Sequence, residues 1–167
     1  GTFNGEQRDL IQELIDEKEK NNAFIANYIA KWNETSEPFF VKNLENLQGD
    51  ERDVIMISTT YGMNVETNKI HQRFGPINSD VGWRRLNVMF TRSKQKMDIF
   101  TSLKSNDIKV TENSSRGVKS LKAFLSIKFS RVQALPYSSF RAFSLENKKF
   151  SLFISSNGST AISLSKS

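Results

Sequence analysis

A run of apolar and β-branched residues over 53–60, DVIMISTT, constrains the fold of this chain more than any other feature. It is bounded by polar turns and is apolar enough to predict a central buried strand. A second run over 39–44, FFVKNL, predicts another strand. Helical spacing of apolar residues predicts an amphipathic helix over 6–17, with Asn4 as a candidate N-cap, and a second helix that ends near Pro38. Strands separated by helices predict an α/β fold with a parallel sheet.

The alternation of elements continues after the apolar run. Glycine, proline and polar residues over 61–82 predict a long loop, of a length that is usually functional or mobile. Residues 83–93 have helical character, 97–103 predict a strand, and 116–129 carry apolar residues on one helical face. We therefore expect one domain over residues 1–129.

The composition changes near residue 130. Residues 130–167 are rich in serine with scattered phenylalanines, and form a poorly patterned C-terminal tail. Alternation with a period of two over 149–155 is compatible with one short strand, but no core to receive it is evident. We expect this tail to be an extension of the domain or a disordered segment.

Rare residue types and charge exclude several kinds of chemistry. The 167 residues include 24 Lys and Arg against 18 Asp and Glu, a net charge of +6, and no cysteine, which excludes disulfides and thiolate sites. His71 is the single histidine, so a zinc site is not expected. Because no apolar run reaches the ~18 residues of a membrane span and no signal peptide is evident, we expect an intracellular, cytoplasmic protein without a membrane partner. The chain opens at Gly1 inside a strand-to-helix transition, which predicts a piece of a larger polypeptide.

Two segments carry the residues best suited to chemistry: 47–55, LQGDERDVI, and 82–94, GWRRLNVMFTRSK. The first places a glycine and several charges directly before the predicted buried strand, where a backbone can approach a ligand closely. The second places three arginines on one helix, with Arg85 and Arg92 on the same face. Arginine suits multi-donor binding of phosphate oxygens. Taken singly, each segment also fits a solvated edge or an exposed, salt-bridged face.

At these residues the chain resembles the superfamily 1 helicases, and within them the branch that includes the nonsense-mediated-decay helicase and its bacterial relatives. Residues 48–55 resemble motif V, residues 84–94 resemble motif VI, and residues 2–8, TFNGEQR, are similar to motif IV. Three motifs in the expected order make a specific match. The resemblance extends over about residues 1–127.

The resemblance implies the second RecA-like domain of a helicase, a P-loop NTPase fold in which a parallel sheet is flanked by helices. ATP would bind between this domain and a first RecA-like domain of the same polypeptide, with the Mg²⁺ ligands in that first domain and no metal ligand here. Single-stranded DNA or RNA would be the partner. In motif VI the resemblance assigns the arginine finger to Arg85, with Arg92 as the next catalytic candidate, and Arg84 to nucleotide binding.

The other motifs add binding residues by the same resemblance. In motif IV, Gln7 and Arg8 would lie near the nucleotide. In motif V, Glu51 would face the ribose, and Gly49 would contact the nucleotide. Contacts to nucleic acid are implied for a separate set of residues: Gln48, Thr91 and Lys94.

The sequence also departs from the family pattern. Where relatives commonly have Ala-Leu-Thr-Arg-Ala-Arg, this chain has MFTRSK over 89–94, so that Lys94 keeps a point charge but not the bidentate geometry of arginine. No phosphate-binding loop of the form G-x-x-x-x-G-K-[ST] occurs. The chain alone is therefore expected to lack ATPase activity. Two other readings stay open, a non-catalytic nucleic-acid-binding module and a degenerate helicase fragment.

Overall fold

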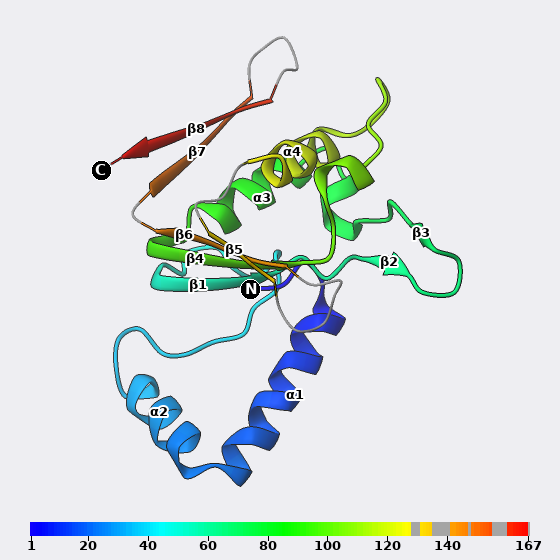
Figure 1. The fold of residues 1–167 in the computed structure, drawn as a ribbon. Helices are drawn as coiled ribbons and strands as arrows, with labels where there is room; N and C mark the ends of the chain where they lie inside the picture. The colour runs from blue at the N-terminus through cyan, green and yellow to red at the C-terminus, as the bar shows by residue number, and fades with distance from the viewer. Residues whose placement is uncertain (128–130, 135–140, 147, 155–159, 167) are drawn as a thin grey trace.

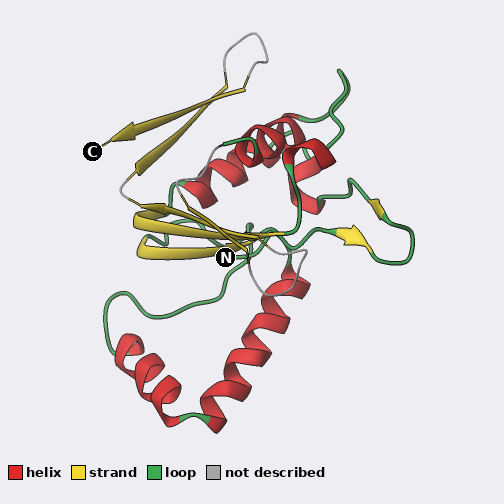
Figure 2. Cartoon of the chain, viewed as in Figure 1, coloured by secondary structure: helices red, strands yellow, loops and turns green. Residues whose placement is uncertain are grey.

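A computed structural model describes residues 1–127 with their side chains (Figure 1). Of the following residues it describes the backbone of 131–134, 141–146, 148–154 and 160–166. Figure 2 shows the same view coloured by helix, strand and loop. Among the described residues no helix combines the length and the apolar character needed to cross a membrane.

The two N-terminal helices are confirmed. Helix α1 covers Gly5–Asn21 and α2 covers Ala23–Asn33, so the second helix ends before the expected Pro38. Asn4 is the N-cap of α1, because its side-chain oxygen accepts a hydrogen bond from the backbone N–H of Gln7 at 2.9 Å. The two helices form a hairpin that projects away from the rest of the domain (Figure 1). No residue of α1 is buried: Leu10 and Leu14 of its apolar stripe are exposed, and Ile11 and Ile15 are only half-buried.

The centre of the fold is a parallel pair of strands. Strand β1, Arg52–Ser58, pairs with β4, Ser93–Thr101. On its other side Thr2 forms parallel bridges to Ser58 and to Asn43. The prediction of a strand over 39–44 is wrong, because this segment is irregular apart from the bridge at Asn43. The segment that pairs with it is the N-terminus of the chain, where Thr2 forms the bridge shortly before α1 begins. The pairing is therefore limited to two hydrogen bonds, from the N–H of Thr2 to the carbonyl of Lys42 and from the N–H of Leu44 to the carbonyl of Thr2.

Strand β1 does not have the fully buried environment that its apolar sequence predicts. Ile55 and Ile57 face the core, whereas Val54 and Met56 are 47% and 59% exposed. Successive side chains of a strand point to opposite faces of a sheet. One face of β1 is therefore packed and the other is open, a distinction that a continuous apolar run cannot reveal.

The packed face is covered by two helices. Helix α3, Gly82–Phe90, and α4, Arg116–Leu125, lie on the same side of the β1–β4 pair, opposite the α1–α2 hairpin (Figure 1). Both helices end earlier than the sequence predicts, and β4 begins at Ser93 instead of 97. The core is one cluster of buried side chains from these elements and the loops between them: Phe3, Leu44, Leu47, Ile55, Ile57, Phe74, Ile77, Leu86, Met89, Phe90, Met97, Ile99, Leu103, Ile108, Val118, Leu121 and Phe124.

The loop expected over 61–82 contains short regular pieces. Strands β2, Met63–Asn64, and β3, Lys69–Ile70, form a small hairpin that extends from the domain, and η1, Gly75–Asn78, is a 3₁₀ turn (Figure 1). A second 3₁₀ turn, η2, covers Ser105–Asp107 after β4. The loop is therefore anchored at its end, where Phe74 and Ile77 are buried in the core.

The C-terminal segment contributes further strands. These are β5, Arg131–Ala134; β6, Arg141–Glu146; β7, Lys148–Ile154; and β8, Thr160–Lys166. Strand β6 pairs antiparallel with β4, which makes a mixed sheet of order β1-β4-β6-β5 instead of a wholly parallel one, while β7 and β8 pair with each other. Strand β7 coincides with the alternation over 149–155. Residues 128–130, 135–140, 147, 155–159 and 167 lie outside the described residues, and a domain boundary at 129/130 stays a prediction.

Candidate nucleotide and nucleic-acid site

Helix α3 carries Arg84 and Arg85 of the candidate site, and its apolar side holds it in place. Leu86, Met89 and Phe90 are buried in the core, and the ring of Phe90 stacks on Phe124 of α4 with ring centroids 3.5 Å apart. Because these apolar side chains fix one side of the helix against the core, the backbone positions of the helical arginines are fixed as well.

Arg85 projects from the first turn of α3 with its guanidinium accessible. Its side chain is 37% exposed, and its Nη1 lies 3.3 Å from Oε1 of Glu45. Glu45 is exposed in the turn that precedes the motif V segment. The neighbouring Arg84 is also exposed, with its guanidinium carbon 5.3 Å from the centroid of the Trp83 ring. Both side chains can therefore reach a group outside the domain.

Arg92 has a different environment, because it lies after the end of α3 and directly before β4. Its Nε donates to the carbonyl oxygen of Val88 at 3.1 Å, its Nη2 donates to Oγ1 of Thr91 at 3.4 Å, and its Nη1 lies 3.6 Å from Oε1 of Glu51. The side chain is 21% exposed. Its backbone carbonyl also accepts a hydrogen bond from the N–H of Arg52 at the start of β1. All three guanidinium nitrogens of Arg92 thus have partners within the domain.

The motif V segment forms a turn before β1. Gly49 has φ of +87°, in the left-handed region that favours glycine, and a Cβ placed there would have no atom within 4 Å. Glycine is therefore favoured here by the left-handed backbone conformation, and not by a lack of room for a side chain. Gln48 and Gly49 are exposed, and Asp50 pairs with Lys42 at 2.6 Å, which ties the turn to the preceding segment.

The motif IV residues lie at the start of α1. Nη2 of Arg8 lies 2.6 Å from Oδ1 of the adjacent Asp9, and the backbone N–H of Gln7 is bound by the N-cap Asn4. A Cβ placed on Gly5 would lie 3.9 Å from Nη2 of Arg8 and 4.0 Å from Nδ2 of Asn43. The start of α1 thus approaches the segment that leads into motif V.

Two further motif VI residues already have partners. The hydroxyl of Thr91 donates to the carbonyl oxygens of Asn87 and Val88, at 2.9 and 3.2 Å, which caps the end of α3. Lys94 pairs with Glu37 at 2.6 Å across exposed surface. The hydrogen bond with Lys94 lowers the pKa of Glu37, and the same bond raises the pKa of Lys94.

The structure divides the predicted site residues into two groups. In the first group, Arg85 pairs with Glu45. Glu45 follows Asn43 by two residues, and Asn43 is the residue that the start of α1 approaches. Glu51 and Arg92 meet each other at the start of β1, close in sequence to Lys94 at the start of β4. The expectation that Arg85 and Arg92 share a helical face is wrong, because α3 ends at Phe90 and Arg92 lies in the link to β4. The two arginines contact carboxylates at opposite ends of the motif V turn.

Two acidic partners were missed by sequence reasoning. Glu45 and Glu37 both lie outside the motif patterns, and each pairs with a motif VI residue that is distant in sequence. Glu45 could have been noticed as an acid just before the motif V turn in a basic chain. Nothing in the sequence marks Glu37.

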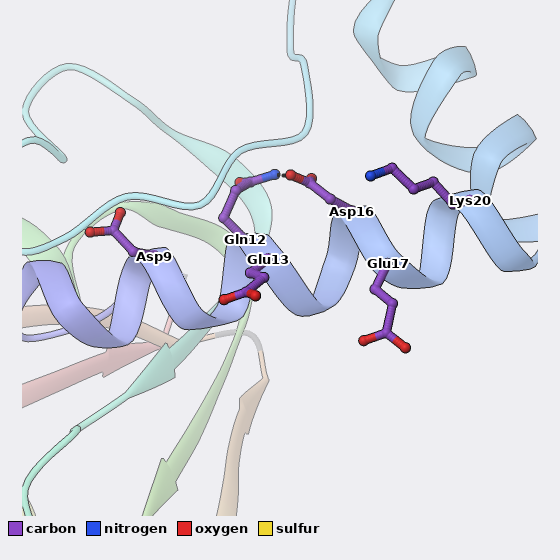
Figure 3. Close-up of a pocket in the computed structure, with 6 residues that line it drawn as sticks. All are labelled: Asp9, Gln12, Glu13, Asp16, Glu17 and Lys20. Carbon is purple, nitrogen blue, oxygen red and sulfur yellow. Dashed lines mark hydrogen bonds between the residues drawn. The ribbon is translucent and has the colours of Figure 1, made fainter.

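Other surface features do not add to this site. A groove runs along α1, lined by Asp9, Gln12, Glu13, Asp16, Glu17 and Lys20 (Figure 3). Its lining is held by the hydrogen bond from Gln12 Nε2 to Oδ1 of Asp16, at 2.8 Å. Within the part of the chain that the structure describes, no group of three His, Cys, Asp or Glu residues is arranged to hold a metal ion.

Comparisons with known proteins agree with this architecture. Residues 2–104 match the model of a family described as an AAA domain. The chain is 39% identical over 125 residues to an uncharacterized ATP-dependent helicase of Mycoplasma genitalium, and 37% identical over 125 residues to its homologue in Mycoplasma pneumoniae. Each match covers 74% of this chain and 10% of the relative, so the chain spans about a tenth of the length of these relatives. No solved structure gives a significant match. With a family match over more than half of its residues, this mixed α/β chain belongs to the AAA domain family, a helicase-like family of P-loop NTPases.

Proposed function

We propose that this chain is the second RecA-like motor domain of an ATP-dependent helicase that acts on single-stranded DNA or RNA. The domain would comprise residues 1–129 and belong to superfamily 1, in the branch that includes the nonsense-mediated-decay helicase. The relatives named above support this proposal, because both are described as ATP-dependent helicases. The observation that carries it is the environment of Arg85.

Arg85 meets the requirements of an arginine finger better than Arg92 does. A finger must reach phosphate oxygens that belong to a nucleotide held largely by another domain, so its guanidinium has to be accessible. Arg85 is partly exposed and is paired through Nη1, whereas every guanidinium nitrogen of Arg92 is engaged within the domain. We therefore assign the finger to Arg85 and a structural role to Arg92.

The nucleotide would bind between this domain and the first RecA-like domain of the same polypeptide. ATP with Mg²⁺ would supply the phosphoryl group, whose developing charge a fixed arginine stabilises. On this side of the nucleotide the chain would contribute Gln7, Arg8, Gly49 and Arg84, together with the carboxylate of Glu51. The exposed, cationic side chains of Arg84 and Arg85 fit an anionic ligand.

The nucleic-acid strand would be contacted by Gln48, Lys94 and the segment around Thr91. Gln48 is exposed, and Lys94 is accessible although it pairs with Glu37. Because exposed ion pairs are weak, the ammonium of Lys94 can exchange its carboxylate partner for a phosphate. The hydroxyl of Thr91 is used within α3, so we expect a backbone or methyl contact there.

The test is ATP turnover by the full-length protein with Arg85→Ala, compared with Arg92→Ala. We expect Arg85→Ala to lower kcat by about 10³-fold or more with little change in KM, because a finger acts on the transition state. Arg92→Ala should lower kcat far less at a temperature where it stays folded. Binding of single-stranded nucleic acid should be nearly unchanged in both variants.

Other outcomes select other functions. If Arg85→Ala turns over ATP at the wild-type rate while Arg92→Ala does not, the finger is Arg92. If the wild-type full-length protein binds nucleic acid but does not hydrolyse ATP, the chain belongs to a non-catalytic binding module. A protein that does neither is a degenerate helicase.

A further inference from the structure

We propose that Glu45 is a positioning residue for the arginine finger, because its carboxylate holds the guanidinium of Arg85 in the orientation from which it reaches phosphate. This inference rests on the proposed function, since it concerns how Arg85 performs the role assigned to it there. The contact that carries the inference is the ion pair between Nη1 of Arg85 and Oε1 of Glu45, at 3.3 Å.

The backbones on both sides of this ion pair are fixed. Glu45 lies between Leu44 and Leu47, which are both buried in the core, and the N–H of Leu44 donates to the carbonyl of Thr2 at 2.8 Å. On the other side, the buried Leu86 follows Arg85 directly in α3. Two exposed side chains thus meet from rigid supports, so the pair restricts the guanidinium without a large ordering cost.

The position of Arg85 in its helix makes a neighbouring carboxylate useful. Arg84 and Arg85 lie in the first turn of α3, where the positive end of the helix dipole disfavours cations. That turn contains no acidic residue. Glu45 therefore supplies, from another segment, the negative charge that α3 itself lacks at this end.

The ion pair leaves Arg85 able to bind phosphate at the same time. A guanidinium has five N–H donors, and Glu45 approaches that of Arg85 through Nη1 alone. The opposite edge of the guanidinium stays available for phosphate oxygens. Glu51 and Asp50, the acids of the motif V turn, are paired with Arg92 and Lys42, so neither duplicates the contact that Glu45 makes.

Steady-state ATP hydrolysis by the full-length protein tests the inference, with Glu45→Gln, Glu45→Asp and the surface control Glu13→Gln. We expect Glu45→Gln to lower kcat on the order of tenfold at unchanged KM, since misplacing a catalytic group affects the transition state most. Glu45→Asp keeps the charge and should recover part of the loss. Glu13→Gln, in the exposed groove of α1, should hydrolyse ATP at the wild-type rate.

A second variant separates positioning from a general structural effect. Arg85→Lys keeps a cation but removes the guanidinium that Glu45 orients, so adding Glu45→Gln to Arg85→Lys should cause much less than the tenfold loss seen in the wild-type background. Multiplicative losses would mean that Glu45 acts independently of Arg85 and would overturn the inference.

The two proposals fail in distinguishable ways. If Arg85→Ala abolishes turnover while Glu45→Gln retains the wild-type kcat, only the positioning role of Glu45 is wrong. A higher kcat in Glu45→Gln would also overturn it, because Glu45 would then restrain the finger. If Arg85→Ala has the wild-type kcat, the proposed function fails and this inference fails with it.

Discussion

Gly117 lies so close to Ile77 that a Cβ on Gly117 would be 1.9 Å from the carbonyl oxygen of Ile77. Gly82 approaches the same carbonyl, and a Cβ there would lie 2.1 Å from it. Helices α3 and α4 thus both begin against one carbonyl of the η1 turn. This close approach is what requires glycine in both helices, and it joins the helix that carries Arg85 to the helix that supports it.

Gly117→Ala is expected to destabilise the domain by about 3 kcal/mol, because the added methyl group cannot coexist with a backbone oxygen and α4 must shift. Urea unfolding followed by circular dichroism measures the free energy of unfolding. The comparison is Gly49→Ala, where there is space and the cost is backbone strain alone, about 1 kcal/mol. A smaller loss in Gly117→Ala than in Gly49→Ala would contradict this account of the contact.

Thr59→Val is expected to lower stability by about 1–2 kcal/mol. Thr59 and Thr101 are both 1% exposed, and their hydroxyls are 2.8 Å apart where β1 and β4 end. Valine keeps the shape but leaves the hydroxyl of Thr101 without this partner. Thr59→Ser keeps the hydroxyl and serves as the control in thermal unfolding. A wild-type free energy of unfolding in Thr59→Val would contradict this role of the hydrogen bond, and any loss in Thr59→Ser measures the packing of the methyl group that serine lacks.

Arg92→Ala is expected to lower the free energy of unfolding by about 1–2 kcal/mol, because it removes hydrogen bonds to Val88 and Thr91 and the ion pair with Glu51. Arg85→Ala should change stability by less than about 0.5 kcal/mol, since its ion pair is more exposed. Urea unfolding of the two variants side by side measures the difference. The reverse order of stability would remove the structural basis for choosing Arg85 as the finger.

The isolated 167-residue chain is expected to release no phosphate from ATP above a control without protein. The chain has no phosphate-binding loop, and its described residues form no cluster suited to a metal ion. A coupled phosphate-release assay with single-stranded DNA and RNA measures the rate. Turnover that persists after contaminating ATPases are removed, and that Arg85→Ala abolishes, would mean that the chain contains a complete site.

Local patterns in the sequence were sufficient for much of the fold. The spacing of apolar residues identified α1, α2, α3 and α4 to within a few residues, and Asn4 as the cap of α1. The run over 53–60 identified β1. These features depend on residues close together in the chain, where periodicity and capping act. The expected strand over 39–44 failed because a strand needs a partner, and its neighbour in space offers only Thr2.

The resemblance of three short segments to helicase motifs likewise depends on the sequence alone, and it predicted the P-loop NTPase class to which the family match assigns this chain. Which arginine is accessible could be decided only by the tertiary structure. Arg85 and Arg92 have the same side chain and lie seven residues apart, and their difference comes from where α3 ends and from partners brought near by packing. Glu45 leaves Arg85 partly exposed, whereas Val88, Thr91 and Glu51 together occupy Arg92. The exposure of Val54 and Met56 has the same origin, because burial depends on which elements cover a face and not on the apolar character of the strand.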